Sequence, residues 1–367
     1  MEQPRIAVTR SSMPPFEEYV AEIADIWDSR WLTNFGTKHN QFIEELRSVV
    51  GDAGIALFTN GHNALEAALA ALGLDSGETI TTPFTFASTT HAISRTGMTP
   101  VFCDVDPATC CIDVSQIESL ITERTRAIVP VHVYGMMCDM EAIDAIARKH
   151  GLKVVYDAAH AFGVRKGGVP AGLFGDTSMF SFHATKVFHS IEGGCVVYQD
   201  ESLAERIREQ QNFGMDYAGE VNVVAGNAKM NEFAAAMGLC NLRHLDDAIS
   251  SRRAATERYR ERLGGAEGIK LLEPQPDVEG NYAYFPAFFD PAVFEGGRDG
   301  IVEKLGAENI LARKYFYPLT CDFPCYSGLP RADVPIARKL ADEVLALPLF
   351  EGLTTEMVDR ICDCILK

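Results

Sequence analysis

The chain has 367 residues, 47% of them hydrophobic and 23% charged, which is typical of a globular protein large enough for two domains. Its formal net charge of -18 argues against a general binder of nucleic acids, because such binding depends on clustered Lys and Arg. No apolar run approaches the roughly 18 residues that span a bilayer, and MEQPRIAVTR lacks the apolar core of a signal peptide. We therefore expect a cytoplasmic protein that binds neither nucleic acid nor membrane.

Ten cysteines are spread along the chain without a paired C-x-x-C pattern. The closest pairs are adjacent, two apart or four apart: Cys110 and Cys111, Cys362 and Cys364, Cys321 and Cys325. This spacing indicates neither a zinc site nor a disulfide framework. We expect reduced thiols in a reducing compartment, and no bound metal.

In chain order, short β-rich runs alternate with helix-like segments as far as about residue 214. The runs fall at residues 55–59, near 79, from 100, from 127, at 153–157, from 178 and from 195. The helical segments include HNALEAALAALGL, DMEAIDAIARKHG and ESLAERIREQQNFG. This alternation predicts an α/β fold with a mostly parallel sheet that carries helices on its faces.

From about Asn231 the pattern changes to a long helical stretch that ends near residue 265. A shorter mixed region follows, with the strand-like run YAYFPAFF and helices near 331–345 and 355–366. We expect a domain boundary near residue 245, with a large domain at 1–245 and a smaller α+β domain at 246–367. The sequence contains no internal repeats and no low-complexity segments.

The first candidate binding turn follows the run at 55–59. In an open α/β sheet, ligands bind beyond the carboxyl ends of the strands. Asn60, Gly61 and His62 lie there and precede a strong helix, so the free N–H groups of this turn suit an anion such as a phosphate. The N-cap of a core helix explains the same residues equally well.

Two later runs end in residues that can carry chemistry. Asp157 ends a strand that is expected to be buried on both faces, where a carboxylate needs a cationic or hydrogen-bonding partner. Alternatively, Asp157 caps a helix that begins at AAHAFG. The stretch SFHATK offers the hydroxyls of Ser181 and Thr185 and the amine of Lys186 at one strand terminus. A buried amine with a lowered pKa can bond to an aldehyde, whereas an ordinary loop lysine would be solvated.

Pyridoxal 5'-phosphate (PLP) would use all of these groups at once. It needs a lysine for its aldehyde, an aspartate for its pyridine nitrogen, a helix N-terminus and hydroxyls for its phosphate, and an aromatic face for its ring. The aromatic residue would be Phe84 or Phe86 in TTPFTFAST, and core packing is the alternative for each of them.

Nine stretches in a fixed order carry a resemblance to a known family. The chain resembles the DegT/DnrJ/EryC1/StrS family of sugar aminotransferases over nearly its whole length. The resemblance implies the PLP-dependent type I (aspartate aminotransferase-like) fold and a homodimer whose active sites are shared at the subunit interface. The nine stretches are TNGHNALEAAL, TTPFTFASTTHAI, PVFCDV, PVHVYG, VVYDAAHAFGV, FSFHATKVFHSIEGG, AGNAKMNEFAAAMG, YFYPL and ADEVLALPLFEGL.

The resemblance also implies roles for the residues singled out above. Lys186 matches the lysine that holds the cofactor and later moves a proton between substrate and cofactor carbons. Asp157 matches the carboxylate that keeps the pyridine nitrogen protonated, so that the ring can accept electrons. Phe86 matches the aromatic residue that stacks on the ring.

Further matches concern the phosphate and the ring hydroxyl. Gly61 and His62 match the phosphate-binding turn, Ser181 matches a phosphate-binding hydroxyl, and Asn227 matches an asparagine that reaches the phosphate from the partner subunit. The family's turn is commonly Ser-Gly-Thr, so at His62 only the backbone contacts are implied. Position 160 is commonly Gln, which bonds the ring hydroxyl. His160 can do the same or stack, and a core or surface histidine is the alternative.

The implied reaction is a ping-pong transamination. L-glutamate gives its amino group to the cofactor, and a keto sugar linked to a nucleoside diphosphate then accepts it. TNGH, TPFTFASTTHAI and YDAAHAFGV look most similar to members that act at C4 of dTDP-4-keto-6-deoxy-D-glucose, with amination at C3 as the alternative. Lys186 argues against the dehydratase branch of the family, in which a histidine replaces the lysine.

A non-catalytic PLP-binding regulator is the alternative from a different class, because members of the family were sometimes regarded as regulators. A regulator that binds DNA would need a basic helix-turn-helix segment, and none is apparent in so acidic a chain. An inactive sensor would be expected to have lost Lys186 or Asp157. Both are present, so an enzyme is favoured.

The residues that contact the nucleotide are harder to predict. Arg313, Lys314 and Tyr315 offer contacts to a diphosphate and sugar, with anchoring of the small domain as the alternative for the aromatic residues. Many family members have Tyr-Arg after the phosphate-binding asparagine, but this chain has Ala228 and Lys229, which weakens any expectation about contacts to a substrate phosphate. Glu192 is expected near the turn that carries the cofactor lysine, although the glycines after it suit a hairpin.

Overall fold

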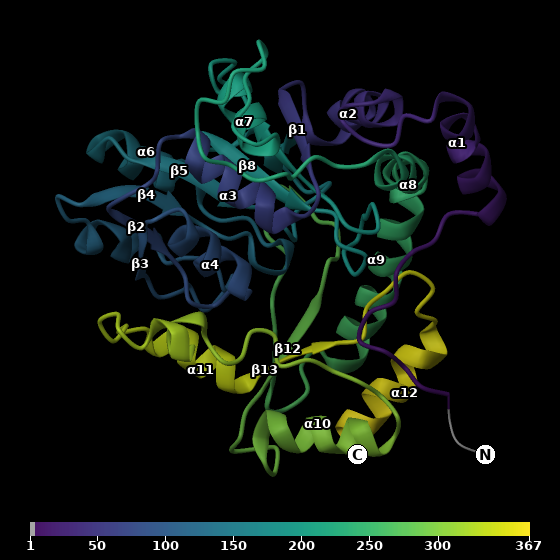
Figure 1. The fold of residues 1–367 in the computed structure, drawn as a ribbon. Coiled ribbons are helices and arrows are strands. Elements are labelled where there is room, and N and C mark those ends of the chain that lie inside the picture. Colours follow the sequence, from purple (N-terminus) through teal and green to yellow (C-terminus); the bar gives the residue numbers. More distant parts are fainter. Residues whose placement is uncertain (1–3) are drawn as a thin grey trace.

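A computed structural model describes residues 4–367 and shows a large sheet and a smaller one, each with helices packed around it (Figure 1). The large sheet has the strand order β1-β9-β8-β5-β4-β2-β3, and among these described strands β9 alone runs in the direction opposite to the others. The prediction of a mostly parallel sheet is therefore confirmed. The strands are β1 (Gly54–Phe58), β2 (Glu78–Thr81), β3 (Thr99–Phe102), β4 (Thr125–Val129), β5 (Lys153–Asp157), β8 (Thr177–Ser181) and β9 (Gly194–Tyr198).

Helices cover both faces of this sheet, as the sequence predicts. Side chains alternate between the two faces along a strand. Leu57 of β1 packs in a buried cluster with residues of α2 and α6, whereas its neighbours Ala56 and Phe58 pack in a second cluster with residues of α3, α4 and α7. These helices are α2 (Thr37–Val50), α3 (Gly61–Ala71), α4 (Ala87–Arg95), α6 (Met140–His150) and α7 (Leu203–Gln211).

The smaller antiparallel sheet has the order β10-β12-β13 and lies near the C-terminal helices (Figure 1). A third buried cluster fills this part of the molecule and includes Tyr259 and Phe289. Ile6 from the N-terminal segment joins this cluster and pairs with Ile310, so the division at residue 245 stays a prediction. The elements are β10 (Ile269–Leu271), β12 (Phe285–Phe289), β13 (Val344–Leu347), α10 (Gly297–Ala307), α11 (Pro335–Glu343) and α12 (Thr355–Leu366).

The long helical stretch predicted from Asn231 is two helices, α8 (Glu232–Arg243) and α9 (Leu245–Leu263), which are separated at His244. The Asn231 side chain caps α8 by accepting a hydrogen bond from the backbone N–H of Ala234 at 2.9 Å. Helix α8 packs on α2 and on α1 (Phe16–Ser29), whereas α9 packs on α12. The two helices therefore belong to different parts of the core.

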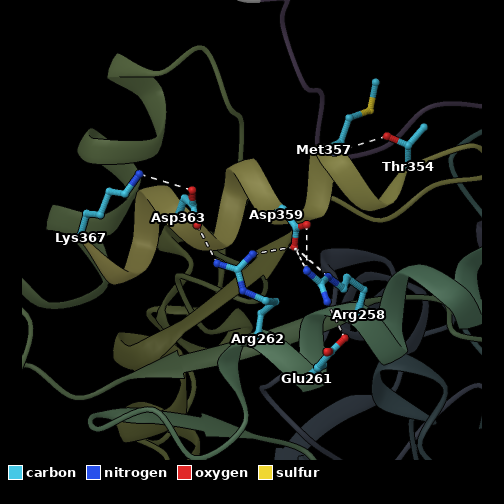
Figure 2. A network of polar contacts seen from close by, with 8 residues as sticks. All are labelled: Arg258, Glu261, Arg262, Thr354, Met357, Asp359, Asp363 and Lys367. Atoms are coloured by element: carbon cyan, nitrogen blue, oxygen red, sulfur yellow. Dashed lines mark hydrogen bonds and ion pairs between the residues drawn. The ribbon is translucent and has the colours of Figure 1, made fainter.

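A network of charged side chains joins α9 to α12 (Figure 2). Arg258 donates two hydrogen bonds to the Asp359 carboxylate, at 2.7 and 2.8 Å. Arg262 donates to Asp359 and to Asp363, each at 2.6 Å, and Lys367 pairs with Asp363 at 3.3 Å. These contacts hold the C-terminal helix against the smaller sheet's cluster.

Short elements complete the described chain. No helix within residues 4–367 combines the length and the apolar character needed to cross a membrane. The short elements are α5 (Val114–Ile117), β6 (Arg165–Lys166), β7 (Val169–Pro170), β11 (Val278–Glu279) and the 3-10 turns Glu118–Leu120, Val133–Gly135, Ala171–Leu173, Thr320–Asp322 and Pro324–Tyr326.

Candidate active site

The segments that follow β1, β2, β5 and β8 meet around one cavity of about 300 Å³, which Arg313 and Tyr315 also line. These strand ends meet because parallel strands present their carboxyl ends at the same edge of a sheet. Asn227, predicted to serve the partner subunit's site, does not line the cavity. The other seven predicted site residues do: Gly61, His62, Phe86, Asp157, His160, Ser181 and Lys186.

Lys186 lies in the turn between β8 and β9, where its backbone N–H donates to the carbonyl of His183 at 2.9 Å. The side chain is half-buried, and its Nζ lies 5.8 Å from the centre of the Tyr284 ring. Burial lowers the pKa of the amine, while Tyr315 and Asp157 oppose that shift. A lower pKa increases the neutral fraction of the amine, which is the form that bonds to an aldehyde. Lys186 is therefore not an ordinary solvated loop lysine.

Asp157 ends β5 and is only 4% exposed. Its Oδ2 accepts a hydrogen bond from Thr89 Oγ1 at 2.7 Å, and its Oδ1 accepts one from the backbone N–H of Ala159 at 3.1 Å. Burial raises the pKa of the carboxyl, and the hydrogen bonds and Lys186 act in the opposite direction. The structure has no helix between Asp157 and the next element, β6, so the alternative of a helix cap is wrong.

The turn after β1 offers backbone donors to an anion. Asn60 caps α3 by accepting from the N–H of Asn63 at 2.8 Å, and within residues 4–367 the N–H groups of Gly61 and His62 donate to no protein group. The His62 side chain is held by other groups, with Nδ1 2.9 Å from Ser88 Oγ and Nε2 paired with a glutamate at 3.0 Å. The turn therefore offers its backbone N–H groups, and not the His62 side chain, to a ligand.

Glycines bring this turn against the ends of β8 and β9. A Cβ atom on Gly61 would lie 2.8 Å from the Cβ of Ser181, which is closer than real side-chain contacts. A Cβ on Gly194 would lie 2.7 Å from the backbone N of Gly61. The two glycines therefore place the Ser181 hydroxyl next to the free N–H groups of the turn.

Phe84 and Phe86 differ in burial. Phe84 is fully buried and packs edge-on against the rings of Tyr134 and Phe316, so it is a core residue. Phe86 lines the cavity, is 53% exposed, and lies 6.2 Å from the ring of Tyr315. An exposed apolar ring at the wall of a cavity is suited to stacking on a flat ligand.

His160 forms part of the wall between the cavity and the core. Its Nδ1 accepts a hydrogen bond from the backbone N–H of Tyr134 at 3.1 Å, and its ring stacks parallel to Phe316. Burial holds the pKa of His160 well below its usual value, so the ring is neutral and carries its proton on Nε2. The residue is thus a buried histidine that also offers a donor toward a ligand.

Comparison with known proteins gives the same account of the fold over the whole chain. Residues 16–366 match the DegT/DnrJ/EryC1/StrS aminotransferase family. The dTDP-4-amino-4,6-dideoxy-D-glucose transaminase of Shigella dysenteriae is 41% identical over 366 residues, which cover 100% of this chain and 99% of that protein. The GDP-perosamine synthase of Caulobacter vibrioides is 32% identical over 365 residues and covers 98% of this chain and 96% of its own length.

The chain belongs to the DegT/DnrJ/EryC1/StrS aminotransferase family. A crystal structure of the protein DesI, in the presence of its TDP-sugar product, superposes with a TM-score of 0.94 at 36% identity, covering 99% of this chain and 92% of DesI. The predicted type I aminotransferase fold is confirmed, and this family and its solved members are PLP-dependent aminotransferases.

Asn227 lies outside the cavity of its own chain. It is exposed, and its Oδ1 accepts a hydrogen bond from Lys229 Nζ at 2.7 Å. Lys229 also donates to Asn212 Oδ1 at 2.7 Å. Its role toward a partner subunit stays a prediction.

The three residues suggested for the nucleotide end separate in the structure. Arg313 and Tyr315 line the cavity, and Arg313 makes no ion pair within the described chain. Lys314 instead pairs with Asp299 at 2.8 Å, so it does not face the cavity. Glu192 lies in the wall, as expected from its position in the turn after Lys186.

Sequence reasoning missed Thr89 and Tyr284. Thr89 bonds the carboxylate of Asp157, and its place on α4 three residues after Phe86 is a spacing that puts two residues on one side of a helix. The helical spacing from Phe86 could therefore have predicted that Thr89 also faces the site. Tyr284 approaches from a segment almost 100 residues downstream in sequence, and no local pattern marks it.

Proposed function

We propose that this aminotransferase moves the amino group of L-glutamate to C4 of dTDP-4-keto-6-deoxy-D-glucose, with PLP as its cofactor and a ping-pong mechanism. One observation carries the proposal: the amine of Lys186, the buried carboxylate of Asp157 and the anion-binding turn at Gly61 line a single cavity. The choice of sugar rests on relatives, because the Shigella and Escherichia coli transaminases named for the corresponding amino sugar are each 41% identical to this chain.

The cavity fits PLP group by group. The N–H groups of Gly61 and His62, with the hydroxyl of Ser181, would hold the phosphate, and the tight approach at Gly61 leaves no room there for a side chain. Phe86 would cover one face of the ring, and His160 Nε2 would donate to the ring hydroxyl.

When bound, PLP supplies an electron-withdrawing ring that stabilises negative charge on the carbon that loses a proton. Asp157 would accept a hydrogen bond from the protonated pyridine nitrogen and keep the proton there. Lys186 would bind the aldehyde carbon in the resting enzyme. Once displaced by an amino substrate, its neutral Nζ would take a proton from the substrate carbon and deliver it to the neighbouring carbon of the cofactor.

We further propose a cytoplasmic homodimer with shared active sites. Large apolar side chains that would otherwise face water support a subunit interface, including Trp27 of α1, Trp31 and Phe213. Asn227, exposed and outside its own cavity, would then complete the phosphate site of the partner. All ten cysteines are free thiols, which fits a reducing compartment.

Visible absorbance tests the proposal directly. We expect the purified protein loaded with PLP to be yellow and to lose the yellow band on addition of L-glutamate, as the cofactor takes up the amino group. Lys186→Ala should lack the band of a lysine-bound cofactor and should not cycle. The converted enzyme should regain the band when dTDP-4-keto-6-deoxy-D-glucose is added. A protein that cannot be loaded with PLP would contradict the proposal.

A further inference from the structure

Glu192 places a carboxylate in the cavity that none of the cofactor contacts requires. Its side chain is 59% exposed and lines the same cavity as Lys186. Within the described chain no Lys or Arg side chain pairs with it, and its one recorded ionic partner is His183, whose Nε2 lies 3.5 Å from Oε1. Glu192 is therefore available to a ligand.

The His183 ring is oriented by Thr185 and not by Glu192. The backbone N–H of Thr185 donates to His183 Nδ1 at 3.3 Å, and the Thr185 hydroxyl lies 2.8 Å from the same nitrogen. With Nδ1 acting as an acceptor, the proton of the neutral ring is on Nε2, on the side of Glu192. This long contact uses one oxygen of the carboxylate at most, and the other is free to accept a hydrogen bond.

A carboxylate here is unexpected on electrostatic grounds. The proposed amino donor carries two carboxylates and the proposed amino acceptor carries a diphosphate, so both substrates are anions. A negative side chain in the wall repels them unless it contacts a neutral part that offers donors. The sugar ring is that part, because its hydroxyls donate hydrogen bonds and an ionised carboxylate only accepts them.

We propose that Glu192 accepts a hydrogen bond from the sugar hydroxyl on the carbon next to the keto carbon, and so selects the sugar. The inference rests on the proposed function. The keto carbon must reach the atoms on which Lys186 acts, and the hydroxyl next to it is therefore the ring donor held nearest to this lysine. Glu192 and His183 flank Lys186 in the same connection between β8 and β9 and line the same cavity. Glu192 is accordingly a specificity-determining residue, not a proton carrier.

The test pairs variants of Glu192 with two sugars. Single-turnover rates of the amino-loaded enzyme are measured with dTDP-4-keto-6-deoxy-D-glucose and with its 3-deoxy counterpart, which lacks the hydroxyl next to the keto group. Because a hydrogen bond to a charged acceptor is involved, we expect the wild-type enzyme to prefer the parent sugar by about 10- to 100-fold in rate over apparent Kd. Glu192→Ala should reduce this preference to about twofold or less, and Glu192→Gln should give an intermediate value.

Two further measurements keep the test independent of turnover and folding. Calorimetry with dTDP-6-deoxy-D-glucose and its 3-deoxy counterpart, which carry no keto group, should show the same loss of preference in Kd. The visible cofactor band reports whether each variant is folded and loaded. Glu201→Gln, an exposed carboxylate outside the cavity, is the matched control and should keep the full preference.

The outcomes separate the two proposals. A Glu192→Ala enzyme that keeps the full preference, or that loses rate equally with both sugars, would overturn the role of Glu192 and leave the C4 reaction standing. A wild-type enzyme that takes the amino group from L-glutamate but converts neither sugar would overturn both the C4 substrate and this role.

Discussion

Thr89 offers a direct test of how the buried carboxylate of Asp157 is kept in place. Its Oγ1 donates to Asp157 Oδ2 at 2.7 Å, lies 2.8 Å from Thr85 Oγ1, and is fully buried. Thr89→Val keeps the shape of the side chain and removes the donor. A hydrogen bond to a charged group contributes about 1.5–3 kcal/mol, so we expect the free energy of unfolding of the cofactor-free protein at pH 7.5 to fall by about that amount.

The size of this effect should depend on pH in a defined direction. Burial raises the folded-state pKa of Asp157 above the ordinary value of 3.8, so the folded protein holds this proton more tightly than the unfolded chain. The carboxyl therefore costs stability as the pH rises through that folded-state pKa. The hydrogen bond from Thr89 favours the ionised form of Asp157 and so reduces this loss of stability. Thr89→Val should consequently destabilise most above the folded-state pKa and less below it, where the carboxyl is neutral.

Urea unfolding of four proteins measures the coupling: the wild type, Thr89→Val, Asp157→Asn and the double variant. In the Asp157→Asn background the threonine bonds a neutral amide, so Thr89→Val should cost only about 0.5–1.5 kcal/mol and should be independent of pH. Equal costs of Thr89→Val in the two backgrounds, or a cost that does not change with pH in the wild-type background, would refute the reasoning.

Two further predictions concern the turn and the aromatic wall. Gly61→Ala should lower the free energy of unfolding by about 1–3 kcal/mol, because its Cβ would lie 2.8 Å from that of Ser181. The control, Gly306→Ala, adds a Cβ in open space on α10 and should stabilise the protein by up to about 1 kcal/mol. Equal melting temperatures would contradict a tight approach at the turn. Phe84→Ala should cost about 3–5 kcal/mol of stability, whereas Phe86→Ala should mainly weaken PLP binding, by about 2- to 10-fold in a fluorescence titration. A Phe86 variant with unchanged PLP affinity would remove the stacking role.

The large sheet was predictable because its strands are short apolar runs separated by helices of regular periodicity. The N-terminal helices were not predicted, and their burial shows why. Helix α1 buries Ile26 alone among its residues, so its sequence lacks a sustained apolar stripe. Helix α10 carries glycines at 297, 300 and 306, which lower its helix propensity. The break at His244 was missed because helical periodicity continues on both sides of it.

The site was predictable where it depends on strand ends and not where it depends on packing between distant segments. Asp157 and Lys186 follow apolar runs, and the rule that ligands bind beyond the carboxyl ends of parallel strands brings them together. The sequence did not distinguish a core role from a cavity role for Phe84 and Phe86, whereas their burial in the structure does. Tyr284, the residue before β12, comes within 5.8 Å of Lys186 Nζ from almost 100 residues away in sequence, and local sequence carries no record of that contact.

Asp157 and Glu192 reach the cavity from different kinds of backbone: Asp157 from a strand and Glu192 from a connection between strands. Asp157 is fixed by the pairing of β5 with β8, in which it lies opposite Met179, and a slip of one residue would turn its side chain to the other face of the sheet. Glu192 and Tyr315 instead lie outside the strands, and Arg313 is joined to β13 by a backbone bridge to Ala346. Because Glu192 lines the cavity and none of the proposed cofactor contacts requires it, substitutions there should change the choice of sugar more than the reaction itself.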